Sequence, residues 1–496
     1  MKIQQFLDHH SVATNPFADE DAQTDLVFKG SCIRTVFHPA WDKIYGDPTE
    51  PATSVVFGEK GSGKTALRLQ MVRRLTDFNA EHPDHQVFVV QYDDFNPFLD
   101  RFRERFSRWR RRMDHVLGQW RLWDHIDSIL SLGVTQLVDR ILEARQARHP
   151  AARDEPLPVE LLDRSQGRDV LLLAAYYDQS TAQSPVIRWR RLRKRLRWPN
   201  WWARWDIGLG VLVTLCVLAS VVWRDWHWLG HIWPWLAMAA GWGPAAWRWL
   251  KVAWHALRIV RSVPVLNHNW RILQRILLGF PASQLVGQPA PLAQRTDDRY
   301  ELLAKLQGVL RALHLDGILV LVDRVDEPYL ITGATELMQA LVWPMLDNKF
   351  LKHPGMGLKL LLPIELERQL DRQAPEFHQR ARLDKQNLIR SLAWTGQSLY
   401  DLAAARLRAC AAEGKTAPAL PDLFEATIDD RRLKDAMATL RVPRHLFKFM
   451  YRLLTTHCNA HSDQEPVWKI SSGTFESVLA VYQRDQEAFD RGVGAG

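Results

Sequence analysis

Short unbroken apolar runs alternate along the chain with longer stretches in which apolar residues recur at helical spacing. Unbroken runs are typical of strands buried on both faces of a parallel sheet, and helical spacing is typical of helices packed on such a sheet. The predicted strands are residues 54–57, 86–92, 318–322 and 358–362. Helical spacing marks residues 65–79, 120–145, 388–411 and 446–454. The pattern predicts an α/β fold in which helices flank a parallel sheet.

The first predicted strand leads directly into a glycine-rich loop that fits the pattern G-x-x-x-x-G-K-[ST]. The loop comprises Gly58, Glu59, Lys60, Gly61, Ser62, Gly63, Lys64 and Thr65. Its glycines let backbone N–H groups point at phosphates, and the following helix adds the positive end of its dipole. We expect Lys64 to reach the β- and γ-phosphates of ATP and the Thr65 hydroxyl to help hold Mg²⁺. A chance glycine–lysine turn is the alternative, and the flanking strand and helix argue against it.

A second, acidic motif follows the predicted strand at residues 318–322. Asp323 stands at the carboxyl end of that strand, where open α/β sheets bind ligands, and is the expected Mg²⁺ ligand. Either Asp326 or Glu327 is expected to orient and deprotonate the attacking water. The alternative is an acidic loop that only ends a strand. Glu365, after the strand at 358–362, is a weaker candidate for contact with the γ-phosphate.

Two long apolar runs, residues 207–223 and 228–247, lie between these two motifs. The first contains no charged residue, and 14 of the 22 tryptophans lie between Trp189 and Trp254, as in interfacial aromatic belts. Because both nucleotide motifs must lie on one side of a membrane, the number of crossings must be even. The runs therefore predict a transmembrane helical hairpin, with a buried or interfacial hairpin as the alternative.

Basic residues flank the two apolar runs on their outer sides. They are Arg188, Arg190, Arg191, Arg193, Lys194, Arg195, Arg197 and Arg204 before the first run, and Arg248, Lys251, Arg258 and Arg261 after the second. Cytoplasmic flanks of membrane spans are enriched in such residues, which predicts two spans with the ATPase part in the cytoplasm. The polar start of the chain predicts no cleavable signal peptide.

The net charge of +9 is concentrated locally, above all in residues 101–112, which hold seven arginines with two phenylalanines and a tryptophan. This stretch has three interpretations: contact with an anionic membrane surface, nucleic-acid binding, or a solvated helix face. The four cysteines are far apart and form no C-x-x-C pair. That pattern indicates a reducing compartment and argues against a zinc site.

The C-terminal part is predicted to be a helical lid. Arg444 follows Pro443 at the start of the helix at 446–454 and is the first choice for an arginine that reaches the γ-phosphate, from the lid or from a neighbouring subunit. The alternative role is a structural ion pair. The expected domains are residues 1–100 and 301–370 for the two parts of the nucleotide domain, 101–300 for the helical insertion and 371–496 for the lid.

These features together resemble the KAP family of P-loop NTPases, in which membrane helices are inserted between the two nucleotide motifs. The acidic run with Arg324 and Glu327, and the Pro443–Arg444 step, look more like STAND and Orc-like AAA+ signalling ATPases. The resemblance implies a bacterial inner-membrane ATPase that acts as a switch or assembly platform, with phage defence as one setting. Its expected partners are ATP, Mg²⁺, the lipid membrane, and a second copy of the chain or another protein.

Two other functions remain open from the sequence. One is a nucleic-acid-handling ATPase at the membrane surface that uses residues 101–112 as its contact. The other is a scaffold that binds ATP without hydrolysing it.

Overall fold

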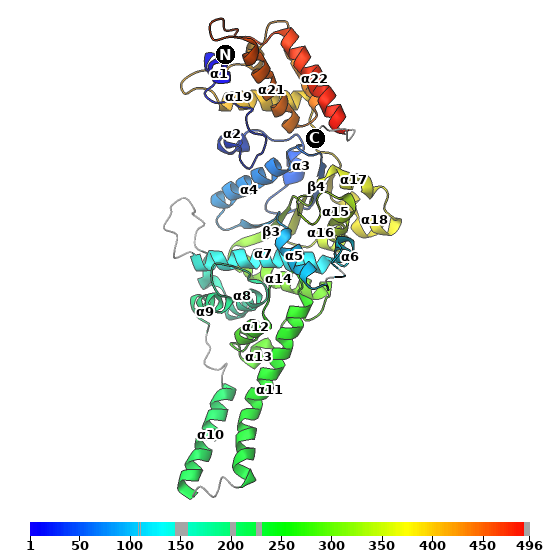
Figure 1. Cartoon of the computed structure of the whole chain (residues 1–496). Coiled ribbons are helices and arrows are strands. Elements are labelled where there is room, and N and C mark those ends of the chain that lie inside the picture. The colour runs from blue at the N-terminus through cyan, green and yellow to red at the C-terminus, as the bar shows by residue number, and fades with distance from the viewer. Residues whose placement is uncertain (108, 110, 144–156, 199–204, 225–230, 491–496) are drawn as a thin grey trace. The chain divides into compact units, whose positions relative to one another are not determined.

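The structure is a computed structural model that describes residues 1–107, 109, 111–143, 157–198, 205–224 and 231–490. The chain forms two compact units. The first contains Met1–Pro83, Leu319–Asp326 and Leu346–Gly496, and the second contains Asp84–Ile318 and Glu327–Met345 (Figure 1). The glycine-rich loop and Asp323 belong to the first unit, although a long insertion separates them in sequence.

A five-stranded sheet has the strand order β2-β3-β4-β1-β5. The strands are β1 (Ser54–Gly58), β2 (Gln86–Tyr92), β3 (Leu315–Val322), β4 (Met356–Pro363) and β5 (Asn387–Ile389). β1 pairs in parallel with β4 and β5, so that Val55 lies opposite both Leu360 and Leu388. All residues of β1 and β4 are buried, as expected for inner strands of a parallel sheet. The α/β class and the four predicted strands are confirmed.

The predicted helix at 388–411 is wrong over its first third. Residues 387–389 form β5 along the edge of β1, and the helix α19 (Gly396–Ala409) begins only after Thr395. The Thr395 hydroxyl accepts a hydrogen bond from the Ser398 N–H and so caps the helix N-terminus. Apolar spacing alone does not distinguish three residues of edge strand from a first helical turn.

Helices supply most of the first unit. Its α-helices are α1 (Ile3–His9), α2 (Leu26–Gly30), α3 (Trp41–Tyr45), α4 (Lys64–Glu81), α16 (Asn348–Leu351), α17 (Ile364–Leu370), α18 (Pro375–Ala381), α19, α20 (Asp430–Leu440), α21 (Pro443–Ala460) and α22 (Ser472–Asp490). α4 confirms the helix predicted after the loop, and α21 confirms the helix predicted at 446–454.

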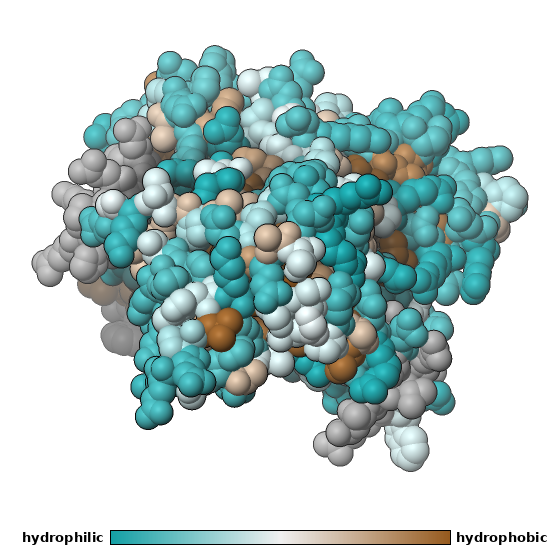
Figure 2. All heavy atoms as spheres, turned by 90° about the horizontal axis from the view of Figure 1, so that it is seen from above, coloured by the Kyte–Doolittle hydropathy of each residue, from teal (hydrophilic) through white to brown (hydrophobic). Residues whose placement is uncertain are grey.

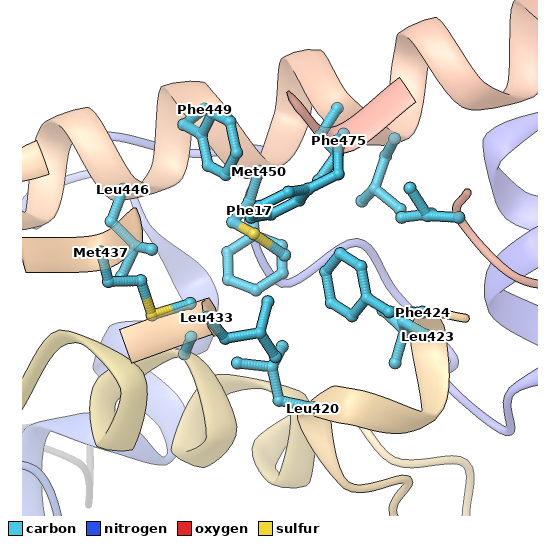
Figure 3. Close-up of a cluster of buried hydrophobic side chains, with 14 of the residues drawn as sticks. Phe17, Leu420, Leu423, Phe424, Leu433, Met437, Leu446, Phe449, Met450 and Phe475 are labelled. Carbon is cyan, nitrogen blue, oxygen red and sulfur yellow. The ribbon is translucent and has the colours of Figure 1, made fainter. Parts of the chain in front are cut away.

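The start of the chain packs with the C-terminal helices. Phe17 is 1% exposed and lies among apolar side chains of the segment that contains α20, α21 and α22 (Figure 3). The cluster drawn around it includes Leu420, Leu423, Phe424, Leu433, Met437, Leu446, Phe449, Met450 and Phe475. Arg406 of α19 donates to the Pro16 carbonyl at 2.6 Å and pairs with Asp25. The N-terminal segment is therefore part of the C-terminal helical core.

The second unit is built mainly of helices. Its α-helices are α5 (Asn96–Glu104), α6 (Met113–Leu117), α7 (Leu122–Glu143), α8 (Arg164–Tyr177), α9 (Pro185–Arg195), α10 (Trp205–Arg224), α11 (Ile232–Ser262), α12 (Trp270–Leu277), α13 (Ala282–Leu285), α14 (Thr296–Ala312) and α15 (Thr335–Val342). α7 confirms the long helix predicted at 120–145. A buried ion pair between Arg299 and Asp127 joins α14 to α7 at 3.0 Å.

α10 and α11 lie side by side (Figure 1). The Trp242 indole N–H donates to the Thr214 hydroxyl at 3.0 Å, and Asp206 pairs with Arg248 at 2.9 Å. Among the described residues, Trp205–Trp223 is the one helix long and apolar enough to cross a membrane by length and composition. The second predicted span, residues 228–247, does not meet this criterion, and residues 228–230 lie outside the described part. Two spans are therefore not confirmed.

Candidate functional site

The glycine-rich loop adopts a conformation that only glycine accommodates readily. Gly61 and Gly63 have positive φ angles of 89° and 95°. A Cβ at Gly61 would lie 2.6 Å from the Arg444 Cβ, and one at Gly58 would lie 2.4 Å from the Ser62 Oγ. Each of the three predicted glycines is therefore required by backbone angle or by close packing.

Lys64 is the first residue of α4, and its side chain folds back over the loop. Its ammonium donates to the Gly58 carbonyl at 2.7 Å and to the Glu59 carbonyl at 3.0 Å. Burial lowers the pKa of Lys64, while nearby Asp326, Asp323 and Glu365 raise it. The lysine is thus held by loop carbonyls beside the acidic groups of the site.

Thr65 and Asp323 meet although 258 positions separate them in sequence. The Thr65 hydroxyl donates to the Asp323 Oδ2 at 3.2 Å, and the Arg68 guanidinium donates to the same oxygen at 3.2 Å. Arg68 and Asp323 are 3% and 2% exposed. Burial raises the pKa of Asp323, and the Arg68 charge lowers it. Arg68 was not predicted from the sequence, where its only signal is its position one helical turn after Thr65.

The Thr65 hydroxyl and the Asp323 carboxylate are suitable ligands for Mg²⁺. Mg²⁺ usually takes one or two protein carboxylates or hydroxyls and completes its octahedron with phosphate oxygens and water. The described residues contain no group of three or more His, Cys, Asp or Glu side chains placed to hold a metal. The Ser62 Oγ is buried and makes no hydrogen bond with described groups. The site thus offers a pair of hard ligands and an unused hydroxyl.

The acidic run after β3 contributes to the loop's surroundings through Asp326. Of the acids that raise the pKa of Lys64, Asp326 has the largest effect. Arg324, between the two aspartates, has a positive φ of 61°, which marks a sharp turn of the backbone at the strand end. Glu327 is the first residue of the second unit's segment Glu327–Met345. The acidic run therefore brings Asp326 close enough to Lys64 to act on its charge.

Arg444 of the same chain lies against the loop. Its backbone N–H donates to the Gly61 carbonyl at 3.4 Å, and its Cβ lies where a Gly61 side chain would be. Its guanidinium Nε is 4.0 Å from a Glu20 carboxylate oxygen, and Lys448 is 3.4 Å from the same oxygen. Pro443 at the first position of α21 starts the helix that carries this arginine. Glu20 was not identified from the sequence.

The segment between β5 and α19 forms another wall of the loop. The Trp394 indole N–H donates to the Ser62 carbonyl at 2.9 Å, and the Leu392 N–H donates to the Phe57 carbonyl at 2.7 Å. His38 contacts the Trp394 ring edge-on and bonds to the Ala393 carbonyl. Trp394 carries no sequence signal because its contact depends on β5 pairing with β1.

The arginine-rich stretch at 101–112 is not one continuous helix. α5 ends at Glu104, and positions 108 and 110 lie outside the described residues. Arg105 donates to the Arg261 carbonyl at 2.6 Å and the Val263 carbonyl at 3.1 Å, while Arg101 pairs with Glu104. Several of these arginines therefore bond within the protein.

Comparison of the chain with protein-family models, curated proteins and solved structures finds no match. The argument for function therefore depends on the geometry of the site.

Proposed function

We propose that this protein is a membrane-anchored ATPase that binds ATP with Mg²⁺ and hydrolyses it to switch its conformation or assembly. The observation that carries the proposal is the contact between Thr65 and Asp323, at 3.2 Å, beside a loop whose lysine is already positioned. A hydroxyl and a carboxylate from distant segments, next to backbone N–H groups and a lysine, match the needs of a magnesium–triphosphate complex.

The loop residues have distinct roles in this proposal. The backbone N–H groups around Gly61 and Gly63 bind the phosphates, and Lys64 leaves the loop carbonyls to contact the β- and γ-phosphates. Thr65 and Asp323 hold Mg²⁺, which when bound neutralises charge on the phosphate oxygens. Arg68 keeps Asp323 ionised and oriented.

Hydrolysis needs a base near the γ-phosphate. The water oxygen forms a bond to the γ-phosphorus, the bond to the bridging oxygen breaks, and a carboxylate takes the proton from water. Asp326 and Glu327 both remain candidates, and the effect of Asp326 on Lys64 favours Asp326. Glu365 follows β4, the strand between β1 and β3, and is a candidate to orient the water.

Arg444 links the nucleotide to the helical lid. The Arg444 guanidinium faces Glu20, a residue of the N-terminal segment. A γ-phosphate carries more negative charge than one carboxylate, and binding it would draw Arg444 away from Glu20. Because the N-terminal segment and α19 to α22 share one core, this exchange would move them together. Assembly with a second copy or another protein is the proposed output.

α10 is the proposed membrane anchor, with α11 packed along it. Both nucleotide motifs must lie on one side of the membrane, so the proposal requires two crossings, with the ATPase part in the cytoplasm. We rank the nucleic-acid-handling alternative second, because arginines of the stretch at 101–112 already bond to the protein's own carbonyls and acids.

Full-length protein tests both halves of the proposal. Membranes are washed with alkaline carbonate, and the retained protein is purified in detergent and assayed for Mg²⁺-dependent phosphate release from ATP. We expect retention in the pellet, activity in wild type, and loss of activity in Lys64→Ala and Asp323→Asn. An exposed lysine outside the site, Lys385→Ala, is the control. Release by carbonate would refute the anchor, and equal phosphate release by Lys64→Ala and wild type would refute the nucleotide site.

Asp326→Asn and Glu327→Gln, compared under the same conditions, identify the base. If both variants bind ATP and hydrolyse it at the wild-type rate, neither carboxylate is the base. If ATP binds normally but wild type itself releases no phosphate, the scaffold function replaces the ATPase function.

A further inference from the structure

The part of the chain around α10 and α11 has an extreme charge imbalance. Residues 179–296 contain sixteen lysines and arginines but only two aspartates. One of these, Asp206, is 4% exposed and paired with Arg248. The other, at position 225, lies outside the described residues. Within the described part of this stretch, every exposed charged side chain is therefore positive.

Eight of these exposed bases form what we call the basic collar. They are Arg190, Arg191, Lys194 and Arg195 on α9, Lys251 and Arg258 on α11, and Arg271 and Arg275 on α12. Arg258 lies over the Trp254 ring at 4.6 Å, and Arg271 lies over the Trp270 ring at 5.4 Å. Trp254 is exposed, and arginine stacked on an exposed tryptophan is well suited to the boundary between lipid and water.

The collar adjoins the exposed apolar surface of α10 and α11 and overlaps its edge on α11, where Leu250 and Trp254 are 57% and 52% exposed. Asp206 at the start of α10 pairs with Arg248 on α11, which marks the same level on both helices. From this level toward the far ends of the two helices, large apolar side chains are exposed, up to 91% for Trp223 and 71% for Trp233. From Arg248 toward Ser262, α11 buries Val252, Ala253, Ala256 and Ile259. The same part of α11 exposes the collar bases Lys251 and Arg258 together with Trp249, Leu250 and Trp254.

Packing holds α9 and α12 near the Asp206–Arg248 ion pair. Arg248 donates to the carbonyls of Leu278 and Phe280, at 2.9 Å and 2.7 Å, just after α12. The Trp189 ring of α9 packs on Phe280, with ring centres 5.4 Å apart. The Gln274 side chain of α12 donates to the Trp249 carbonyl at 3.2 Å. The bases on all three helices are therefore held by the folded body of the unit.

The face shown in Figure 2 is mainly hydrophilic, with hydrophobic side chains in small separate groups. Contiguous exposed apolar surface indicates a membrane or partner, and a rim of bases without acids complements anionic headgroups. A nucleic acid would also satisfy the bases, but it would leave the adjoining tryptophans and leucines in water.

We propose that the basic collar binds anionic lipid headgroups, so that the protein selects bilayers that contain them. This inference rests on the proposed membrane anchor and adds the lipid class to it. Each base near an anionic surface contributes about 1 kcal/mol, so losing three of them should weaken the preference by on the order of 100-fold, and reversing their charge should weaken it at least that much.

The experiment transfers full-length protein from detergent into vesicles and measures flotation. One set of vesicles is phosphatidylcholine alone, and in the other phosphatidylglycerol replaces part of it. The test variant combines Arg190→Glu, Arg191→Glu and Lys194→Glu, all exposed side chains of α9. The matched control combines Arg368→Glu, Arg372→Glu and Lys385→Glu, exposed bases of the first unit. We expect wild type and control to prefer phosphatidylglycerol, and the test variant to lose this preference while keeping ATP hydrolysis.

The outcomes separate the two proposals. Carbonate-resistant flotation with both vesicles, equal for wild type and the test variant, would keep the anchor and overturn the collar. Flotation with phosphatidylglycerol only, reversed by salt, would support the collar and overturn the spanning anchor. Flotation with neither would overturn both. Loss of duplex DNA binding in the test variant, without any change in lipid preference, would assign the collar to nucleic acid and overturn the lipid proposal.

Discussion

Replacing Arg68 with methionine tests the electrostatic design of the site directly. Arg68 and Asp323 are almost fully buried, and their charged atoms are 3.2 Å apart. At an effective dielectric constant of about 20, the Coulomb attraction at this distance is about 5 kcal/mol. Removing one partner of a buried pair leaves an uncompensated charge and costs about 3–5 kcal/mol. We expect Arg68→Met to lower the unfolding free energy by about that amount at neutral pH.

The loss of stability caused by Arg68→Met should change with pH. Burial raises the pKa of Asp323 above its ordinary value of 3.8, and the Arg68 charge lowers it. Without Arg68 the pKa rises further. A raised folded-state pKa gives stability that is complete below the unfolded pKa and lost as pH rises through the folded-state pKa. The stability difference between wild type and Arg68→Met should therefore be smallest in acid and grow with pH.

Thermal unfolding and Mg²⁺-dependent binding of a fluorescent ATP analogue, both measured across a pH series, provide the assay. Mg²⁺ competes with the proton on Asp323, so Arg68→Met should need a higher pH for half-maximal Mg²⁺-dependent binding. Arg68→Lys keeps a positive charge and should recover part of the loss. Adding Asp323→Asn to Arg68→Met should cost less than the sum of the single changes, with a coupling of about 1–3 kcal/mol. An additive double variant, or a stability difference that does not change with pH, would refute the reasoning.

Three other substitutions have clear expected outcomes. Gly61→Ala forces a side chain into a positive φ of 89° and a 2.6 Å contact, so ATP binding should fail, whereas Gly473→Ala, with open space around it, should bind normally in the same assay. Burial raises the pKa of Asp124 to about 8, so its ionisation costs stability as pH rises through that value. Asp124→Asn should raise the melting temperature relative to wild type above pH 8 and leave it nearly unchanged in acid; an equal effect at both would be the contrary result. Phe17→Ala should cost about 3–5 kcal/mol in chemical unfolding because its ring is enclosed by the C-terminal core. Leu26→Ala, at a side chain 78% exposed, should cost little, and equal losses would contradict the packing.

Much of the site could be predicted because its chemistry is local in sequence. Glycines at 58, 61 and 63 allow a loop conformation that other residues rarely adopt. The positions of Lys64 and Thr65 are set by the helix that starts at Lys64. Asp323 was predictable because it ends an aliphatic strand. Arg68 and Glu20 were not, since an arginine on a helix face and a glutamate in a loop give no signal until their partners are placed.

Prediction from local apolar spacing failed where pairing with a neighbouring element determined the secondary structure. Residues 387–389 became a strand because β1 had a free edge, although their apolar spacing also suited a helix. The second apolar run carries Pro244 and many tryptophans, and among the described residues α10 alone meets the length and composition criterion for a membrane span.

The sequence by itself determined four of the five strands, the loop and the sign of charge around α10 and α11, because backbone preference and hydrophobic period act over a few residues. The tertiary structure alone decided which distant groups meet. Thr65 and Asp323 are brought together by the sheet, and Trp394 reaches the loop because β5 pairs with β1. Phe17 packs in the C-terminal core because burying an apolar side chain is favourable whatever its distance along the chain from the residues around it.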